Sequence, residues 1–435
     1  MLTGNAEQLF KPASANPDRI FMNFGVLIRL SIMMFLQFFL WGSWYATVGN
    51  YMDEHGMAGL KANAYSVGPL AAILAPLFLG LIADRYFATE RVLAVLHILG
   101  GITMFIAPTL TGDAFIWLLL VHMLCYMPTL GLTNTLAFHH ITNQEKYFPV
   151  VRVAGTVGWI AAGILVSKVL GADKLPLPFY VAGGAALVLG VYSLTLPHTP
   201  PPAKGQPASV SQILGLESLK LMKSRNFAVF MISSFLICIP LSAYYAFAAV
   251  FILASGQENA AYVMSFGQMS EVFFMLAMPL FFARLGVKWM LLIGMLAWVV
   301  RYGLFAGAAE SGAFWMIFGG VLLHGICYDF FFVTGYIYVD KRAHASIRGQ
   351  AQSFLVLMTQ GLGMLVGTQI CGVVVARIAA NPEKLTMPEW STFWLLPCIM
   401  AGIVMLVFAF LFKDDAVEVA SDEPAKERPE PSAAV

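Results

Sequence analysis

The stretch MSFGQMSEVFFMLAMPLFF, residues 264–282, decides the fold class. It is almost wholly apolar and long enough to cross a bilayer as one helix, which takes about 20 residues. One carboxylate, Glu271, lies near its centre. A charged side chain at that depth costs about 3 kcal/mol, so it faces a water-filled cavity or a partner and usually serves a function. The stretch therefore predicts a membrane protein with a polar site inside it.

The composition of the whole chain agrees with this prediction. Its 435 residues are 59% hydrophobic and 11% charged, whereas a soluble domain carries about 25% charged residues. The net charge is +1 without a basic tract, which argues against nucleic acid as a partner. Nucleophile elbow, phosphate-binding loop and metal motif are all missing from the sequence, so we expect neither an enzyme nor a bound cofactor or metal.

Twelve apolar runs follow one another along the chain. They lie near residues 26–49, 65–84, 91–111, 114–136, 149–171, 178–196, 226–254, 260–282, 287–308, 312–338, 350–376 and 391–412. With the amino terminus inside the cell, most of the 25 Lys and Arg residues fall in cytoplasmic loops, as the positive-inside rule requires. We therefore expect an all-α protein of twelve transmembrane helices with both termini in the cytoplasm.

A long interruption divides the spans into two sets of six. The predicted regions are a cytoplasmic amino terminus (1–25), a first six-helix half (26–196), a linker with an amphipathic helix (197–225), a second half (226–412) and a disordered cytoplasmic tail (413–435). The loops after the second and eighth spans, GLIADRYFATERV and LFFARLGVKWM, echo each other weakly. Such internal symmetry is typical of transporters whose substrate site lies at the midplane between the halves.

The loop after the second span carries a G-x-x-A-D-R turn, formed by Gly80, Ala83, Asp84 and Arg85. It resembles the loop signature of the major facilitator superfamily. Gly80 would permit close helix approach, while Asp84 and Arg85 would pair with neighbouring helix ends and latch one conformation. The alternative is an ordinary positively charged cytoplasmic loop.

Two sets of polar side chains are candidates for a solute site. Arg152, Thr156 and Trp159 recur at i, i+4 and i+7 and so form one stripe on the fifth span, suited to hydrogen bonding and stacking. In the alternative interpretation Arg152 is a cytoplasmic anchor and Trp159 faces lipid. Gln268 lies one turn from Glu271 on the eighth span, so this amide and carboxyl share a face and suggest a substrate site that also binds a proton.

The tenth span adds a second buried carboxylate, Asp329. His324 and Tyr328 lie four residues apart and share a face, from which Asp329 points away. Asp329 is a candidate for proton coupling, and an ion pair with Arg301 on the ninth span is the alternative. On the seventh span, Tyr245 follows Pro240 and would either line the same cavity or pack as an aromatic residue.

Several segments together resemble the bacterial nucleoside:proton symporters, the nucleoside permeases of the major facilitator superfamily. These are FLQFFLWGSWYATVGNYM, LCYMPTLGLTNTLAF, RVAGTVGW, GQMSE and YDFF, within a resemblance that runs from about Leu30 to Phe412. The resemblance implies proton-driven solute uptake in a major facilitator fold. It places the solute site on the residues that match the family motifs: Arg152, Thr156, Trp159, Gln268, Glu271, Tyr328 and Asp329.

The sequence departs from a well-known permease at four aligned contacts. Ser242 and Tyr245 replace polar amides, His324 replaces a Tyr, and Trp159 replaces a Phe. We keep Ser242, Tyr245 and His324 as substrate-binding candidates, and Glu271 and Asp329 as the proton-coupling pair. Two rival functions remain at this point: import of a sugar or an amino-sugar or muropeptide-like solute, and a membrane sensor that does not transport.

The resulting prediction is a monomeric multi-pass protein of the bacterial inner membrane. It would import nucleosides or nucleoside-like solutes with protons by alternating access, surrounded by membrane lipid.

Overall fold

The structure is a computed structural model that describes residues 23–78, 86–201, 210, 216–344, 347–381 and 384–413. Throughout these residues the regular structure is helical, and nine segments are long and apolar enough to cross a membrane. The prediction of an all-helical membrane protein is confirmed. The contacts divide the chain into two compact units. Unit 1 comprises Met1–Pro207, Tyr245–Val272 and Asn381–Lys384, and unit 2 comprises the remaining residues.

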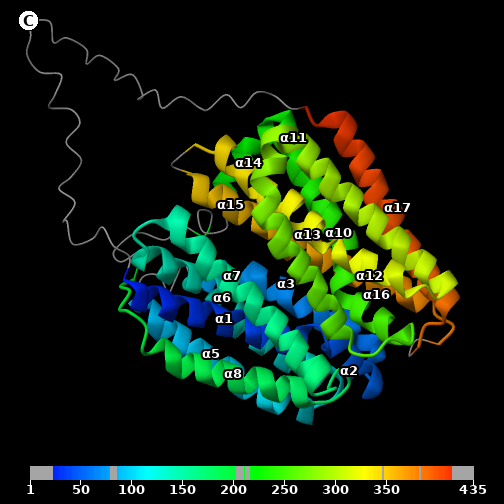
Figure 1. Cartoon of the computed structure of the whole chain (residues 1–435), viewed down its shortest axis with the longest axis horizontal. Helices are drawn as coiled ribbons and strands as arrows, with labels where there is room; N and C mark the ends of the chain where they lie inside the picture. Colours follow the sequence, from blue (N-terminus) through cyan, green and yellow to red (C-terminus); the bar gives the residue numbers. More distant parts are fainter. Residues whose placement is uncertain are drawn as a thin grey trace, which may run out of the picture. The chain divides into compact units, whose positions relative to one another are not determined.

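The helices of the first half belong to unit 1 (Figure 1). They are α1 (Phe24–Tyr45), α2 (Val48–Glu54), α3 (Lys61–Phe78), α5 (Thr89–Ile106), α6 (Gly112–His140), α7 (Gln144–Gly163) and α8 (Leu177–Ser193). Short 3-10 turns, η2 (Ala58–Leu60) and η4 (Ala107–Thr109), precede α3 and follow α5, and α7 continues into a π-helical turn, η5 (Ile164–Val169). The side chain of Asn23 caps α1 by accepting hydrogen bonds from the first free backbone N–H groups.

Glycines decide how closely α7 approaches α1. The two helices pack along each other, and α1 also packs against α8. A Cβ atom at Gly155 would lie 2.7 Å from Cδ2 of Phe38, and one at Gly158 would collide with the carbonyl oxygen of Phe35. Only glycine permits this backbone-to-backbone contact. It aligns the Arg152 stripe of α7 beside α1.

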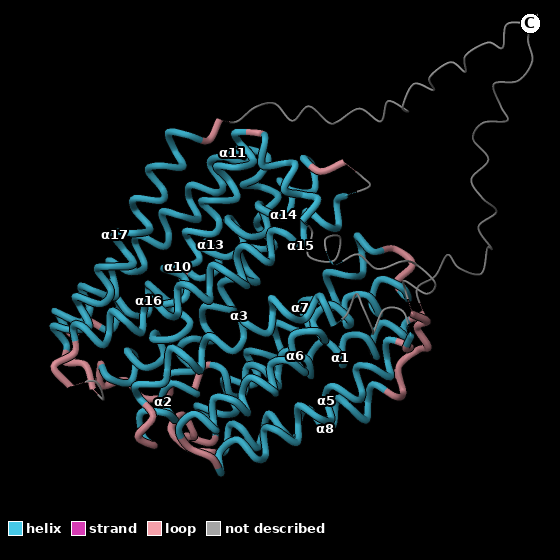
Figure 2. The backbone as a smooth tube through the Cα atoms, turned by 180° about the vertical axis from the view of Figure 1, so that it is seen from behind, coloured by secondary structure: helices cyan, strands magenta, loops and turns pink. Residues whose placement is uncertain are grey.

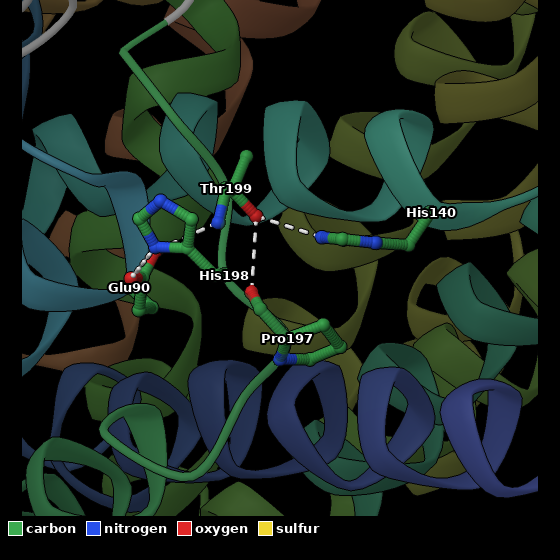
Figure 3. A network of polar contacts seen from close by, with 5 residues as sticks. All are labelled: Glu90, His140, Pro197, His198 and Thr199. Atoms are coloured by element: carbon green, nitrogen blue, oxygen red, sulfur yellow. Dashed lines mark hydrogen bonds and ion pairs between the residues drawn. The ribbon is translucent and has the colours of Figure 1, made fainter.

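Polar contacts anchor the chain segment that follows α8 (Figure 3). The two carboxylate oxygens of Glu90, at the start of α5, contact Nδ1 of His198 at 2.8 Å and accept the backbone N–H of Thr199 at 3.0 Å. The hydroxyl of Thr199 lies 2.9 Å from Nε2 of His140, at the end of α6. The first residues of the predicted linker, from Pro197, therefore bind to unit 1 at the ends of α5 and α6.

The helices of the second half follow a short 3-10 helix, η6 (Leu216–Lys223), which lies in the predicted amphipathic segment. They are α10 (Arg225–Ala254), α11 (Ala260–Ser311), α12 (Phe314–Leu322), α13 (His324–Tyr328), α14 (Thr334–Arg342), α15 (Arg348–Val356), α16 (Met364–Ile378) and α17 (Met387–Leu411). Two π-helical turns, η7 (Asp329–Val333) and η9 (Leu357–Gly363), continue α13 into α14 and α15 into α16. Figure 2 shows the described backbone as helices joined by loops.

The long helix α11 is interrupted at Gly286, whose φ of 67° and ψ of −178° are not helical. Glycine adopts positive φ without the steric cost that other residues meet. The predicted eighth and ninth spans lie on either side of this break. The end of α10 and the start of α11, Tyr245–Val272, belong to unit 1, and the rest of both helices belongs to unit 2.

Candidate functional site

The Arg152 stripe lies against α1 in unit 1. The guanidinium carbon of Arg152 stands 4.7 Å from the centre of the Phe38 ring, within the range of a cation–π contact. Thr156 follows one turn later and is half-buried, as is Trp159. The Gly155 and Gly158 contacts described above hold this turn of α7 in place. The three polar and aromatic side chains therefore extend from a rigid pair of helices.

Trp159 joins a cluster of aromatic rings from four helices. Its ring centre lies 5.3 Å from that of Trp41 and 6.3 Å from that of Tyr45, both on α1. Trp41 also packs 5.3 Å from Tyr126 on α6, and Tyr45 lies 6.3 Å from Tyr245 on α10. We call Trp41, Tyr45, Tyr126, Trp159 and Tyr245 the ring cluster. Trp159 therefore packs against α1. Tyr245 packs against Tyr45 and so lies in the same cluster as Trp159.

Gln37, one turn before Trp41 on α1, is a buried polar residue that the sequence motifs did not indicate as functional. Its Nε2 donates to the hydroxyl of Thr129 at 2.7 Å, and that hydroxyl donates to the carbonyl of Tyr126 at 2.6 Å. The Tyr126 hydroxyl in turn donates to the Gln37 carbonyl at 2.9 Å. The signal in the sequence was the lone amide in FLQFF, but its partner on α6 could not be read from it.

The start of α11 runs along α7 in unit 1. A Cβ atom at Gly163 would lie 3.0 Å from the carbonyl oxygen of Ala261, so the two helices touch there. Further along, Arg152 lies near enough to the Glu271 carboxylate for their charges to interact. Gln268, between these two contacts, is buried, and its Oε1 has no hydrogen-bond partner among the described residues. Arg152, which is far from Gln268 and Glu271 in sequence, therefore shares one region of unit 1 with them.

A second cluster of predicted residues lies in unit 2, around the buried Arg301 of α11. Its Nε donates to the carbonyl of Gly320 on α12 at 3.1 Å, and its Nη2 lies 3.4 Å from Nδ1 of His324. The guanidinium carbon stands 4.1 Å from the centre of the Tyr244 ring. The His324 ring stacks on the same tyrosine, with centres 5.4 Å apart and planes at 19°.

Tyr328 and Asp329 continue from this cluster along the tenth predicted span. The Tyr328 ring lies 5.9 Å from that of His324. Asp329 is fully buried at the first position of the π-helical turn η7. Proton coupling by Asp329 stays a prediction, as does its alternative role as an ion-pair partner of Arg301.

The remaining predicted residues lie outside the two clusters or outside the described part of the chain. Ser242 donates to the carbonyl of Ile239 at 2.7 Å and lies 3.7 Å from the sulfur of Cys371 on α16, so its hydroxyl meets a helix interface. Its role in substrate binding stays a prediction. The predicted latch residues Gly80, Asp84 and Arg85 lie outside the described residues.

Comparison with known proteins adds independent information. The family model described as "Nucleoside H+ symporter" matches residues 24–416. The putative nucleoside transporter YegT of Escherichia coli (strain K12) is 40% identical over 90% of this chain and 95% of its own length. The xanthosine permease of the same organism is 32% identical, over 89% of this chain and 96% of its own length.

A solved structure of a nucleoside transporter is also similar to this chain. The crystal structure of the nucleoside transporter NupG matches with a TM-score of 0.80 and 30% sequence identity, covering 91% of this chain and all of that one. The family resemblance stated from the sequence motifs is therefore confirmed. Since the family model spans nearly all of the predicted helices, the chain belongs to the nucleoside H+ symporter family.

Proposed function

We propose that this chain moves its solute by alternating access and that the residues around Arg152 and Glu271 form its recognition and coupling site. Its family makes it a proton-coupled nucleoside importer of the bacterial inner membrane rather than an enzyme. The observation that carries the site proposal is that Arg152 on α7, on the same helix as Trp159 of the ring cluster, lies close enough to Glu271 on α11 for their charges to interact.

Recognition is assigned to the stripe on α7 and its neighbours. Arg152 offers donors in a fixed fork that suits ribose hydroxyls or base carbonyls. Thr156 adds a hydroxyl, and Trp159 an aromatic face for stacking, which is worth about 1–3 kcal/mol per base in proteins that bind single strands. Gln268 supplies an acceptor oxygen that lacks a partner within the described residues. Tyr245 completes the aromatic surface through Tyr45.

Coupling is assigned to Glu271. Apolar surroundings favour the protonated form of a carboxyl group, whereas a nearby guanidinium favours the carboxylate form. A solute that binds Arg152 would weaken the effect of its guanidinium, so solute binding and proton binding would become linked. One proton carries about 2.3 kcal/mol per 100 mV of membrane potential and about 1.4 kcal/mol per pH unit. Together these would concentrate the solute on the order of several hundred-fold.

The second cluster, in unit 2, supplies the remaining candidate residues. His324 and Tyr328 would contact the solute from the tenth span, Ser242 from the seventh, and Asp329 would join Glu271 in proton coupling. Gly80, Asp84 and Arg85 would form the conformational latch.

The proposed topology has twelve crossings and cytoplasmic termini. At 1.5 Å per residue, the 52 residues of α11 measure about 78 Å, more than twice the roughly 30 Å hydrocarbon core. The break at Gly286 then separates two crossings. The apolar helix α8, which has 17 residues and is shorter than the nine long segments of the described chain, would add a further crossing. Regions 1–25, 197–225 and 413–435 would be cytoplasmic, with six-helix halves at 26–196 and 226–412, in a lipid-embedded monomer.

Competition for uptake tests the substrate. The purified chain in proteoliposomes, driven by an inward proton gradient, is expected to take up labelled uridine and to lose that uptake when unlabelled adenosine is added. N-acetylglucosamine at the same concentration serves as the sugar comparison. Inhibition by the amino sugar alone would favour the rival sugar or muropeptide-like solute. Saturable binding without vectorial flux would favour a sensor.

A further inference from the structure

Arg301 is a buried cation in unit 2 that the proposed mechanism does not use. It lies on α11 and is fully excluded from solvent. A buried charge is tolerated only where hydrogen bonds and neighbouring groups replace its hydration. Arg301 has a carbonyl acceptor on α12 for its Nε and an aromatic face on α10 beneath its guanidinium. Contacts from two helices therefore hold the guanidinium in one orientation.

The third contact of Arg301 determines the protonation of His324. Nη2 of Arg301 lies 3.4 Å from Nδ1 of the imidazole. A guanidinium nitrogen only donates, and it does not lose its proton in proteins. Nδ1 must therefore accept with its lone pair, which leaves the single ring proton of a neutral imidazole on Nε2. A second proton would bring two positive charges together in a buried place.

Two tyrosines also pack beside His324. Tyr244 on α10 stacks on the imidazole, and Tyr328 on α13 lies one turn away along the chain. Asp329 on η7 is the acidic residue nearest along the chain. The guanidinium of Arg301 contacts the imidazole, and its positive charge opposes protonation of the ring. The two tyrosines do not offset this charge, because an unperturbed tyrosine is neutral below about pH 10.

We propose that Arg301 is a positioning residue that keeps His324 neutral and protonated on Nε2. His324 then contributes to recognition as a fixed hydrogen-bond donor for an acceptor oxygen of the solute, and it carries no proton during transport. The solute-facing part of this proposal rests on the proposed function, whereas the tautomer does not. The proposal assigns different roles to two neighbouring residues of the tenth predicted span. His324 would bind the solute, and the carboxylate of Asp329 would be the group of that span that couples protons.

The tautomer is tested without any solute. The full chain, labelled with 15N-histidine and reconstituted in lipid, contains eight histidines, and His324→Gln identifies the signals that belong to His324. Those signals are expected to show a neutral ring protonated on Nε2 from pH 8 down to pH 5.5. In Arg301→Gln they are expected to titrate, whereas Arg301→Lys, which keeps a donating cation, is expected to hold the ring neutral. An imidazolium or an Nδ1-protonated ring at pH 6 in the unaltered chain overturns the proposal.

Uptake tests the role in transport. His324→Gln replaces the fixed ring donor by a flexible amide, so nucleoside affinity is expected to fall about two- to tenfold, the range for one hydrogen bond. Because neither side chain would carry a proton, the pH midpoint of uptake is expected to stay unchanged. A shifted midpoint in this variant would make His324 a proton carrier and overturn the proposal. Absence of nucleoside uptake by the unaltered chain would instead contradict the proposed function and leave the tautomer result standing.

Discussion

At the scale of single residues, Glu271 on α11 and Arg152 on α7 lie near enough for their charges to interact. The two residues are not in the aqueous surroundings of a surface ion pair, because both lie on helices of predominantly apolar residues. An exposed pair of this kind would be worth little and would change little when a ligand arrived. In apolar surroundings the same pair responds strongly to any group that competes for the guanidinium.

Glu271→Gln is expected to uncouple transport. The amide keeps the shape and hydrogen-bonding capacity of the side chain but cannot take up and release a proton. Accumulation driven by a pH gradient should fall from the order of several hundred-fold towards unity, while exchange of nucleoside at equal concentrations persists. Gradient-driven uptake and counterflow in the same proteoliposomes distinguish these two activities. Full accumulation with unchanged proton flux would remove Glu271 from the coupling role.

Arg152→Lys is expected to weaken nucleoside binding about tenfold or more, because an ammonium cannot reproduce the paired donors of the guanidinium. Expression and melting temperature should stay near those of the unaltered chain, because the positive charge is kept. The dissociation constant of the nucleoside, measured by calorimetry in detergent for the variant and the unaltered chain, tests this prediction. If Lys is fully tolerated, the cytoplasmic anchor becomes the better interpretation of Arg152.

The motifs located the stripe on α7 and the pair on α11, because residues on one helix face can be counted along the sequence. They did not reveal Gln37, whose partners Thr129 and Tyr126 lie on a different helix. They also missed the link between Arg301 and His324. Periodicity gives the face of a helix but not the neighbour that the face meets, so contacts between helices had to come from the structure.

At the scale of elements, glycine contacts and helix ends hold the helices in position. The sequence predicted most helices to within a few residues, because hydropathy and length are local properties. It did not predict the π-helical turns η5, η7 and η9, which depend on how one helix accommodates another. It also did not predict that Glu90 and His140 bind the first residues of the predicted linker, 197–225, to unit 1.

Gly158→Val is expected to separate α1 from α7 and to lower stability by about 1–3 kcal/mol, the usual cost of overpacking. The new side chain would meet the backbone of Phe35, which cannot move aside without shifting α1. Gly184→Val on α8 is the matched control, because a Cβ atom there would meet nothing within 4 Å. Melting temperatures of the two variants in detergent should differ clearly. Equal values would show that the α1–α7 contact is not close.

Asp173 makes the start of α11 sensitive to pH. Its carboxylate accepts the backbone N–H of Ala261 at 3.2 Å and the hydroxyl of Ser167 at 2.6 Å. Burial nevertheless raises the pKa of Asp173 above its usual value, and this effect outweighs the two hydrogen bonds. The folded chain therefore binds the proton more tightly than the unfolded chain, so its contribution to stability is lost as pH rises through the raised pKa.

Asp173→Asn is expected to remove this pH dependence while keeping an acceptor for the Ala261 N–H group. Its melting temperature should exceed that of the unaltered chain at pH 7 and converge with it as the pH falls below 4. Asp173→Ala, which loses the acceptor, should be less stable than Asp173→Asn by about 1 kcal/mol at both pH values, as for loss of a helix cap. A constant difference between Asn and Asp across the pH range would contradict the titration of Asp173.

At the scale of the whole molecule, the contacts assign Tyr245–Val272 to unit 1, although these residues follow the linker in sequence. The end of α10 and the start of α11 thus carry residues of the second half into the first unit. Hydropathy could predict two sets of six spans, but it could not predict which segments pack together, because packing depends on shape rather than on polarity.

Cysteine labelling of intact cells tests the proposed topology. Single cysteines placed at residues 50–62 and 378–389 are expected to react with an impermeant maleimide from outside. Cysteines placed at 203–208 and in the tail after Lys413 should react only after the membrane is opened. The native cysteines are first replaced by Ala, and retained nucleoside uptake shows that the chain still folds. Labelling of 203–208 from outside would overturn the arrangement of twelve crossings.

The ring cluster also gives the protein an optical property. The indoles of Trp41 and Trp159 stand edge to face with their centres 5.3 Å apart, with Tyr45 close to both. Excitation energy absorbed by one of these rings passes readily to the next, so the cluster emits as a group. A nucleobase stacked on Trp159 would quench the fluorescence of the cluster. The intrinsic fluorescence of the chain therefore offers a label-free titration of the solute, and Trp159→Phe supplies its blank.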